Sequence, residues 1–354
     1  MSGVETAREV LVALTRRYAF GEVAAMVGAG AAGADLTTGT VAQIQQLCAY
    51  GQRLLDLDAE DLADPDAAAG ANTDQSVAAR VSGDAVPAHL IARGRACRMP
   101  QSPRERDRGA LTSLRPAFRL LLEVIDVRWR RRETAAVVAG VHIASEYAPL
   151  VAWEKVLGHA ADPVLLAADP AFDGRESLFG RYDEPACPHI RPQRSAANRA
   201  LRAASESPNG WRAYLDRQHS HVASALAVCA TECRSPCTVV IGRRQEHRGW
   251  LAESCRAATA LGQSQIVRLR HSAPVGHGFG VPSPDEVRDA WSRSRETIAK
   301  EGRVAGAVLI DDGYPLPGLP SLFGAIAGTD LSADTLLADT AAEIITTLGP
   351  VEPA

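Results

Sequence analysis

Apolar side chains recur every three or four positions over most of the first two-thirds of the chain, which is the spacing of one helical face. The pattern predicts helices over residues 4–27, 37–57, 111–157 and 210–230. Proline removes a backbone hydrogen-bond donor, so we expect a kink or a break at Pro149. The first two-thirds of the chain is therefore predicted to be mainly α-helical.

Two stretches in this part of the chain lack helical periodicity. Residues 58–109 consist largely of Asp, Ala, Gly, Pro and Arg, which predicts a long loop or a partly disordered linker. Residues 168–197 contain several prolines and glycines and are interpreted as an extended connection. Both stretches separate predicted helices from one another.

The last third of the chain changes to short β-branched runs. Three runs, over 238–242, 265–270 and 306–310, have the length and composition of buried strands. Helices are predicted between and after these runs, over 249–261, 283–300 and 332–348. Strands that alternate with helices form a parallel sheet with right-handed crossovers, so we expect a small α/β domain here.

The helix predicted after residue 283 has the clearest start signal in the chain. Ser283 is a favoured N-cap, Pro284 suits the first helical position, and Glu286 can close a capping box. We therefore expect this helix to begin directly after Ser283.

The patterns together predict a mixed fold, with a mainly α-helical N-terminal two-thirds and a small C-terminal α/β domain built on a parallel sheet of three or more strands. The expected domain bounds are a helical segment over 1–62, a loop or partly disordered linker over 63–110, a helical domain over 111–234 and a Rossmann-like α/β domain over 235–354. The chain is long enough for each folded part to bury a core of its own.

The carboxyl ends of the three predicted strands are the first candidate site, because open parallel sheets bind their ligands there. Those ends carry two arginines, a glycine-rich loop with one histidine, and two aspartates. The residues are Arg243, Arg244, Gly276, His277, Gly278, Gly280, Asp311 and Asp312. The arginines can clamp a carboxylate or phosphate, and the loop amides can face a developing negative charge.

Two residues of this set are the candidate catalytic groups. His277 can exchange a proton near neutral pH, and Asp311 can hold a metal ion or a sugar hydroxyl, as can its neighbour Asp312. The leading hypothesis is therefore an enzyme that acts on an anionic small molecule at the edge of the sheet. The alternative for these residues is a flexible loop, solvated arginines and a simple aspartate turn.

A cysteine cluster is the second candidate site. Cys229 and Cys233 are four residues apart on one face of a predicted helix, and Cys237 follows a proline that can turn the chain back. Cys187 with His189, or else Cys255, could complete a zinc or iron–sulfur site. The spacing differs from that of common zinc and cluster motifs, so small apolar cysteines packed in a core explain the pattern equally well.

A histidine and a glutamate on the long 111–157 helix form the third candidate. His142 and Glu146 are neighbours on one helical face, an arrangement that metal sites in helix bundles use. The 210–230 helix offers Asp216, His219 and His221 but no matching Glu-x-x-His motif. A packed helix with one polar seam is the favoured interpretation of this pair.

Two further patterns are less specific. Residues 28–33 match Gly-x-Gly-x-x-Gly, but a dinucleotide fingerprint needs a preceding strand, and this segment follows a predicted helix. Twelve arginines against four acidic residues lie between Arg93 and Arg132, a stripe that could meet nucleic acid or an acidic partner. Few aromatic residues accompany the stripe, so we interpret it as a solvated face with internal ion pairs and do not expect nucleic-acid binding.

Composition narrows the function classes only a little. The chain has 38 basic and 42 acidic residues, for a net charge of −4, and only Lys155 and Lys300 are lysines. Amine chemistry such as a Schiff base is therefore nearly excluded. An arginine- and alanine-rich chain with no apolar signal segment, no sufficiently long apolar span and an odd number of cysteines suggests a cytoplasmic bacterial protein that does not associate with membranes.

Two other function classes stay open beside the enzyme. The long linker and the arginine stripe suit a non-enzymatic interaction or regulatory scaffold, with a protein partner or a second copy of the chain. The cysteines or the His142–Glu146 face suit a zinc, iron–sulfur or di-metal protein.

Overall fold

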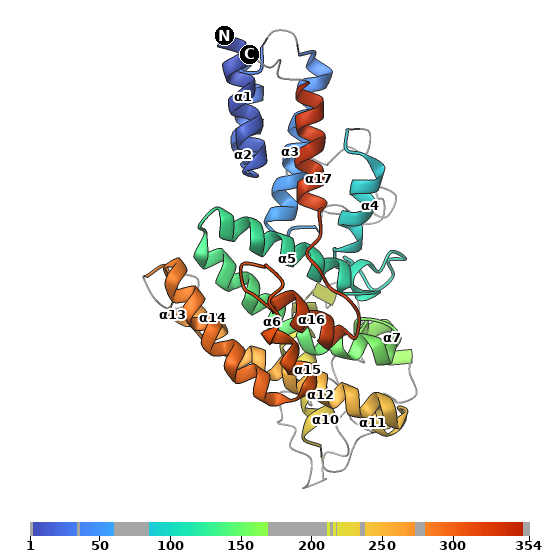
Figure 1. The fold of residues 1–354 in the computed structure, drawn as a ribbon. Coiled ribbons are helices and arrows are strands. Elements are labelled where there is room, and N and C mark those ends of the chain that lie inside the picture. The colour runs from blue at the N-terminus through green and yellow to red at the C-terminus, as the bar shows by residue number, and fades with distance from the viewer. Residues whose placement is uncertain are drawn as a thin grey trace. The chain divides into compact units, whose positions relative to one another are not determined.

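The computed structural model describes residues 3–33, 36–59, 85–168, 211–212, 215–216, 218–233, 238–272 and 280–349. Within these residues the backbone forms helices joined by turns and short extended connections, and no strand is present. The chain divides into two compact units (Figure 1). Unit 1 consists of residues 1–99 and 334–354, and unit 2 of residues 100–333.

Unit 1 is a helical bundle that joins the two ends of the chain. Its described helices are α1 (Gly3–Arg16), α2 (Phe20–Gly28), α3 (Thr38–Leu55), α4 (Ala88–Ala96) and α17 (Leu336–Leu348). The helix α3 packs against both α2 and α17. A Cβ atom at Gly51 would lie 2.8 Å from the ring of Phe20, so the glycine permits the close approach of α2 and α3.

Polar contacts fix α4 to the final helix of unit 1. The guanidinium of Arg93 donates from Nη1 to Oδ2 of Asp339 at 2.5 Å and from Nη2 to Oδ1 of Asp334 at 2.7 Å. Thr335 Oγ1 donates to the same Asp339 oxygen at 2.8 Å. The segment that leads into α17 is thereby held by hydrogen bonds as well as by apolar packing.

Unit 2 is built around one long apolar helix, α6 (Thr134–Leu157). The helices α5, α10, α12, α13 and α16 all contact α6. The other described helices of unit 2 are η3 (Gly109–Leu111), α5 (Arg115–Arg130), α7 (Pro163–Ala168), η5 (Gln218–Val222), α10 (Ala223–Thr231), α11 (Thr238–Ile241), α12 (Gln245–Gly262), α13 (Gln265–Ser272), α14 (Pro284–Ile298), η6 (Ala299–Glu301), α15 (Arg303–Gly306), η7 (Ala307–Leu309) and α16 (Leu319–Ala327).

The helix α6 carries much of the core of unit 2. Ala144, Ala148 and Trp153 are fully buried along it, and the helix continues through Pro149 without a break. The predicted 111–157 helix is instead divided between α5 and α6, at the turn over residues 131–133. Of the described helices, α6 alone is long and apolar enough to cross a membrane, and 61% of its most apolar window is buried inside the structure, as in the core helix of a globular protein.

The predicted parallel sheet is wrong. Residues 238–241 form the short helix α11, residues 265–272 form the helix α13, and residues 303–309 form the helical turns α15 and η7. A short apolar run does not distinguish a buried strand from a turn of helix. The structure also exposes 55% of Ile241 and 56% of Leu309, positions that a central strand would bury. The α/β fold class is therefore corrected to an all-helical one in the described part of the chain.

The predicted start of the helix after Ser283 is confirmed. Ser283 has extended backbone angles, its Oγ accepts a hydrogen bond from the Glu286 amide, and the Glu286 carboxylate accepts one from the Ser283 amide. Pro284 is the first residue of α14. The capping box thus begins α14 as the sequence pattern indicates.

Candidate functional site

The residues expected at a sheet edge have no sheet to bring them together. Gly276, His277 and Gly278 lie outside the described residues, and Gly280 is exposed shortly before α14. The main chain of Arg243 and Arg244 leads into α12. The side chain of Arg244 is largely exposed and lies 3.7 Å from the Glu246 carboxylate, and the Arg243 carbonyl accepts a hydrogen bond from Arg248. The anion-binding role of these residues stays a prediction.

The two aspartates of that set stabilise a turn. The carboxylate of Asp312 accepts hydrogen bonds from the amides of Tyr314 and Gly318, at 3.3 and 3.0 Å, and from Ser321 Oγ at 3.0 Å. Asp311 accepts a hydrogen bond from the amide of Gly313. These contacts account for both carboxylates as caps of the turn that precedes α16.

The cysteine cluster is only partly within the described residues. Cys229 is buried on α10, Cys233 is half-buried just after α10, and Cys237 lies outside the described residues. Cys255 is buried on α12, which packs against α10. Among the described residues, no group of three or more His, Cys, Asp or Glu side chains is placed to hold a metal ion.

The glycine-rich segment 28–33 follows a helix. The helix α2 ends at Gly28, and Gly30 and Gly33 have positive φ angles that permit the following turn. The strand that a dinucleotide fingerprint requires is absent before these glycines, within the residues that the structure describes.

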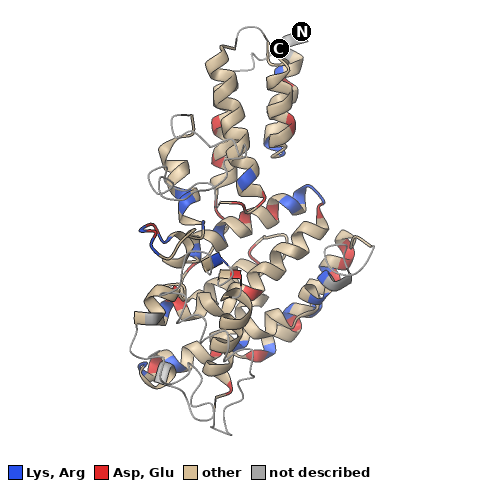
Figure 2. Cartoon of the chain, turned by 180° about the vertical axis from the view of Figure 1, so that it is seen from behind, with Lys and Arg blue, Asp and Glu red and all other residues tan. Residues whose placement is uncertain are grey.

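Many arginines of the 93–132 stripe form ion pairs inside their own unit. At least six of the twelve lie within 4.0 Å of a carboxylate in the described part of the chain, namely Arg93, Arg108, Arg115, Arg128, Arg130 and Arg131. Arg128 and Arg131 both reach Glu133, where basic and acidic segments meet at the turn between α5 and α6 (Figure 2). At least half of the arginines in the stripe thus form internal ion pairs.

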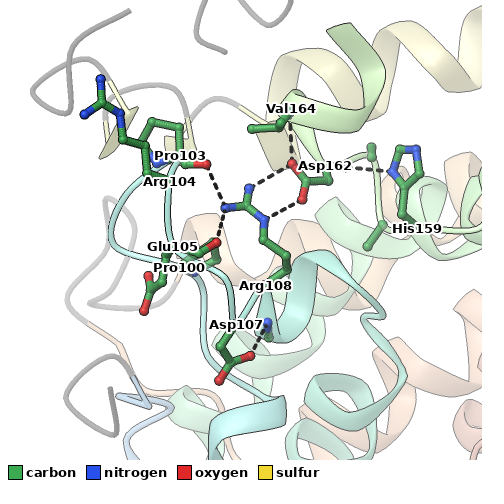
Figure 3. Close-up of polar contacts among 12 residues, drawn as sticks. Pro100, Pro103, Arg104, Glu105, Asp107, Arg108, His159, Asp162 and Val164 are labelled. Atoms are coloured by element: carbon green, nitrogen blue, oxygen red, sulfur yellow. Dashed lines mark hydrogen bonds and ion pairs between the residues drawn. The ribbon is translucent and has the colours of Figure 1, made fainter. Parts of the chain in front are cut away.

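The guanidinium of Arg108 has hydrogen-bond partners on both of its sides. Its Nη1 atom faces three backbone carbonyls, of Ser102, Pro103 and Glu105, and the other side of its guanidinium faces Asp162 (Figure 3). The ring of Trp211 lies 5.2 Å from the guanidinium carbon. These contacts fix the chain that precedes η3.

Of the candidates, the His142–Glu146 pair gathers the most chemistry around it. Three elements contribute to this cluster, which we define as His142 and Glu146 from α6, His219 from η5 and Arg270 from α13. Nε2 of His142 lies 3.3 Å from Oε1 of Glu146, and Nε2 of His219 lies 3.6 Å from Oε2 of the same carboxylate. One carboxylate therefore faces two imidazole rings, one on each oxygen.

Local structure positions each member of this cluster. Successive turns of α6 place His142 and Glu146 on the same face. His219 lies on a single π-helical turn, and such turns recur at functional sites because they displace side chains from the ordinary helical register. Tyr147 of α6 stacks on the His219 ring, with centroids 5.2 Å apart and planes 26° apart.

Arg270 completes the cluster from the third element. Its Nη1 atom is in hydrogen-bond contact with Nε2 of His142. Nδ1 of His142 and Nδ1 of His219 are both buried and have no hydrogen-bond partner among the described residues. Both rings therefore direct Nε2 toward charged groups and Nδ1 toward the protein interior.

The cluster keeps Glu146 ionised. Burial alone would raise the pKa of Glu146, but the contact with His142 and the positive charges of His142, His219 and Arg270 act in the opposite direction. Together they hold the pKa of Glu146 below its ordinary value. A carboxylate that orients an imidazole, beside an arginine, is an arrangement suited to proton transfer on an anion.

A metal ion does not suit this cluster as it stands. A metal at Nε2 of His142 would have to displace a guanidinium cation from the same atom. We therefore treat His142 and Glu146 as part of a hydrogen-bonded cluster and not as ligands of a metal centre.

Two members of this site were missed by the sequence analysis. Arg270 was placed at the end of a predicted strand, and Tyr147 was not singled out. His219 was noted, without a reason to connect it with Glu146. The periodicity of 265–272 could have indicated α13, but nothing in the local sequence indicates that this helix packs against α6.

The comparisons with known proteins give no further guide. No family model, no curated protein and no solved structure matches the chain.

Proposed function

We propose that the chain is an enzyme that acts on an anionic small molecule by proton transfer at the His142–Glu146–His219–Arg270 cluster. The observation that supports this most directly is the single Glu146 carboxylate facing the Nε2 atoms of two imidazole rings, at 3.3 and 3.6 Å. A carboxylate in this position orients the ring and stabilises its charged form, as general acid–base catalysis requires.

Arg270 indicates which class of substrate the cluster would bind. A guanidinium has five N–H donors, and one of them is used by His142. The remaining donors suit a carboxylate or a phosphate group. The charges of Arg270 and Glu146 cancel, so a protonated histidine makes the cluster net positive and favours a bound anion.

The alternative for this cluster is a polar seam that only joins three helices. Sulfate distinguishes the two, because it stays a dianion across the working pH range and mimics a phosphate group. The experiment measures the thermal unfolding midpoint with increasing sodium sulfate, against sodium chloride at equal ionic strength. A ligand at ten times its Kd stabilises the folded state by about 1.4 kcal/mol.

Matched variants make this test specific to the site. We expect Arg270→Met to abolish the sulfate-dependent rise, and Arg268→Met to retain it. Arg268 is an exposed arginine two residues earlier on the same helix, so its removal changes the net charge equally. An equal sulfate response in the two variants would contradict the proposal.

A second experiment addresses the reaction. Native mass spectrometry of the purified chain should detect a copurifying anion in the parent protein and not in Arg270→Met. With that compound as substrate, we expect His219→Gln to lose turnover while it retains binding.

A further inference from the structure

One large apolar side chain of α6 is exposed beside the charged cluster. Ile143 is 38% exposed, and Lys155 is the other exposed residue of this helix. The Lys155 ammonium lies 4.5 Å from the centroid of the Trp250 ring, a contact that suits an exposed cation. A single exposed isoleucine is ordinary in a folded protein, so the neighbours of Ile143 decide whether it has a role.

Loose packing of α6 does not account for the exposure of Ile143. Val141 and Ser145, two residues to either side of it, lie on the opposite face of the helix and are 0% and 5% exposed. In the adjoining turn, a Cβ atom at Gly140 would lie 2.9 Å from Cγ1 of Ile125, so the glycine permits the close approach of α5. The helix is therefore well packed at this level and leaves the side chain of Ile143 accessible.

The neighbours of Ile143 on the helix surface combine charge with apolar area. Residues three and four positions apart lie side by side on a helix, so Ile143 adjoins Glu146 and Tyr147. Glu146 belongs to the cluster, and Tyr147 stacks on the ring of His219. In the other direction Ile143 adjoins Ala139, which is half-buried. The charged groups are thus followed along α6 by an uncharged surface that water reaches.

We infer that the anion bound at the cluster carries an aliphatic chain, and that Ile143 binds this chain while Arg270 binds the charged group. This inference deepens the proposed function and rests on its anion site. The ligand class is a free organic anion with a hydrocarbon chain, such as a carboxylate with several methylene groups. Binding removes apolar surface of Ile143 and of the chain from water, so affinity should rise with chain length.

Helix geometry indicates which chain length fits. Ala139 lies seven residues before Glu146, about 10 Å along the axis of α6 at the rise of an α-helix. Octanoate is long enough to reach from the charged group to Ala139, and butanoate is not. A methylene group that becomes fully buried raises affinity roughly fourfold. One that lies on an open helix surface stays partly hydrated, so we expect a gain of roughly twofold.

NMR of the whole chain, with carbon-13 in the δ1-methyl groups of isoleucine, tests the contact directly. Substitution by leucine removes one signal and so assigns it, in Ile143→Leu, Ile241→Leu and Ile310→Leu. Ile241 and Ile310 are 55% and 53% exposed in the same unit, so hydrocarbon that adsorbs to any exposed isoleucine would shift their signals at least as much. With octanoate we expect the Ile143 signal to shift saturably and the two control signals to stay in place. Equal shifts at all three methyl groups, or no shift at Ile143, would overturn the inference.

The dependence of affinity on chain length gives a second readout. Isothermal titration calorimetry measures the Kd of butanoate, hexanoate and octanoate at equal ionic strength, and in the parent the Kd should fall roughly twofold for each added methylene. Ile143→Ser should lose most of this dependence, and the conservative Ile143→Leu should retain it. Leu165→Ser is the matched control, since Leu165 is a 46% exposed residue of α7 in the same unit. The inference is wrong if the parent shows no dependence, or if Ile143→Ser shows that of the parent.

Variants of α13 separate this inference from the proposed function. Arg270→Gln removes the positive charge without adding apolar surface, and Arg268→Gln does the same at an exposed position of the same helix. We expect Arg270→Gln to weaken the binding of all three carboxylates by a similar factor, and Arg268→Gln to bind them as the parent does. If Arg270→Gln behaves so while Ile143→Ser keeps the chain-length dependence, the anion site stands and the inference alone is wrong. If Arg270→Gln and Arg268→Gln bind the series equally, the anion site itself is wrong, and the inference falls with it.

Discussion

Arg108 and Asp162 form a bidentate ion pair in unit 2, 54 residues apart in sequence. Nε of Arg108 donates to Oδ2 at 2.7 Å, and Nη2 donates to Oδ1 at 2.9 Å. Asp162 is 1% exposed, and its carboxylate also accepts a hydrogen bond from the amide of Val164. A carboxylate this deeply buried depends on its partners, because water cannot replace them.

Asp162→Asn should therefore destabilise the chain strongly. The amide removes one of the two acceptors and leaves a guanidinium with a much weaker partner. We expect the free energy of unfolding to fall by about 3 kcal/mol, the range of a broken buried pair. Urea denaturation followed by circular dichroism measures this change. Asp107→Asn is the control, since Asp107 is exposed and accepts a hydrogen bond from the Gly109 amide.

The stability of the parent protein should depend on the ionisation of Glu146. Its pKa in the folded chain is below its ordinary value of 4.5, so the folded state favours the carboxylate. Its contribution to stability is present above about pH 4.5 and is lost as the pH falls through the folded-state pKa. We expect Glu146→Gln to unfold more easily than the parent at pH 7, by on the order of 1 kcal/mol or less for a half-exposed group.

The pH dependence of the stability difference tests whether the folded state favours the Glu146 carboxylate. Urea denaturation from pH 5 to pH 3 should show the difference between parent and Glu146→Gln shrinking as the pH falls over this range. Glu296→Gln, an exposed position on α14, provides the matched control in the same unit. A difference that grows as the pH falls would mean that Glu146 is not stabilised as a carboxylate.

Local signals predicted many of the helical segments but not the breaks within them, and they predicted the sheet wrongly, for a physical reason. The capping box at Ser283 and Glu286 depends on atoms within one turn, so the sequence contains all of it. A parallel strand depends on neighbours far along the chain. The run at 265–270 has strand-like composition, yet as a helix it buries Ile266 and Val267 and exposes Arg268.

The candidate site was likewise predicted only where it depends on local spacing. The pairing of His142 with Glu146 follows from helical spacing and was predicted from the sequence. The approach of His219 and Arg270 is a tertiary contact, made because η5 and α13 both pack against α6. The grouping of the sheet-edge residues was deduced from a topology that the described part of the chain does not adopt, and their anion-binding role stays a prediction.

The buried thiols should be chemically inert in the folded chain. Burial raises the pKa of Cys255 from 9.0 to about 12 and raises that of Cys48 equally. Such a shift lowers the thiolate fraction at pH 8 by roughly 1000-fold, and the thiolate is the species that reacts. We expect iodoacetamide at pH 8 to label the half-buried Cys97 and Cys233 long before Cys48 and Cys255, as measured by peptide mass spectrometry.

The same labelling in urea is the control for intrinsic reactivity. With the chain unfolded, these four cysteines should react at similar rates. Equal labelling of Cys255 and Cys233 without urea would show that α12 opens readily in the folded protein.

Gly318 is a position at which a single added methyl group should be severely destabilising. Its φ angle is +83°, and a Cβ atom there would lie 1.9 Å from the carbonyl oxygen of Val308 and 2.9 Å from that of Ile310. Backbone cannot yield as a flexible side chain does, and the left-handed conformation adds strain of its own. Gly318→Ala should therefore lower the free energy of unfolding by about 3 kcal/mol.

Gly306→Ala is the matched comparison for that change. Gly306 ends α15 with a helical φ of −59°, and a Cβ atom there meets nothing within 4 Å. Because alanine restricts the unfolded chain more than glycine does, we expect Gly306→Ala to stabilise the protein by about 0.5 kcal/mol. Opposite signs in urea denaturation, for two identical substitutions 12 residues apart, would locate the effect in the close contact with Val308 and the left-handed backbone of Gly318. A similar result for both variants would contradict it.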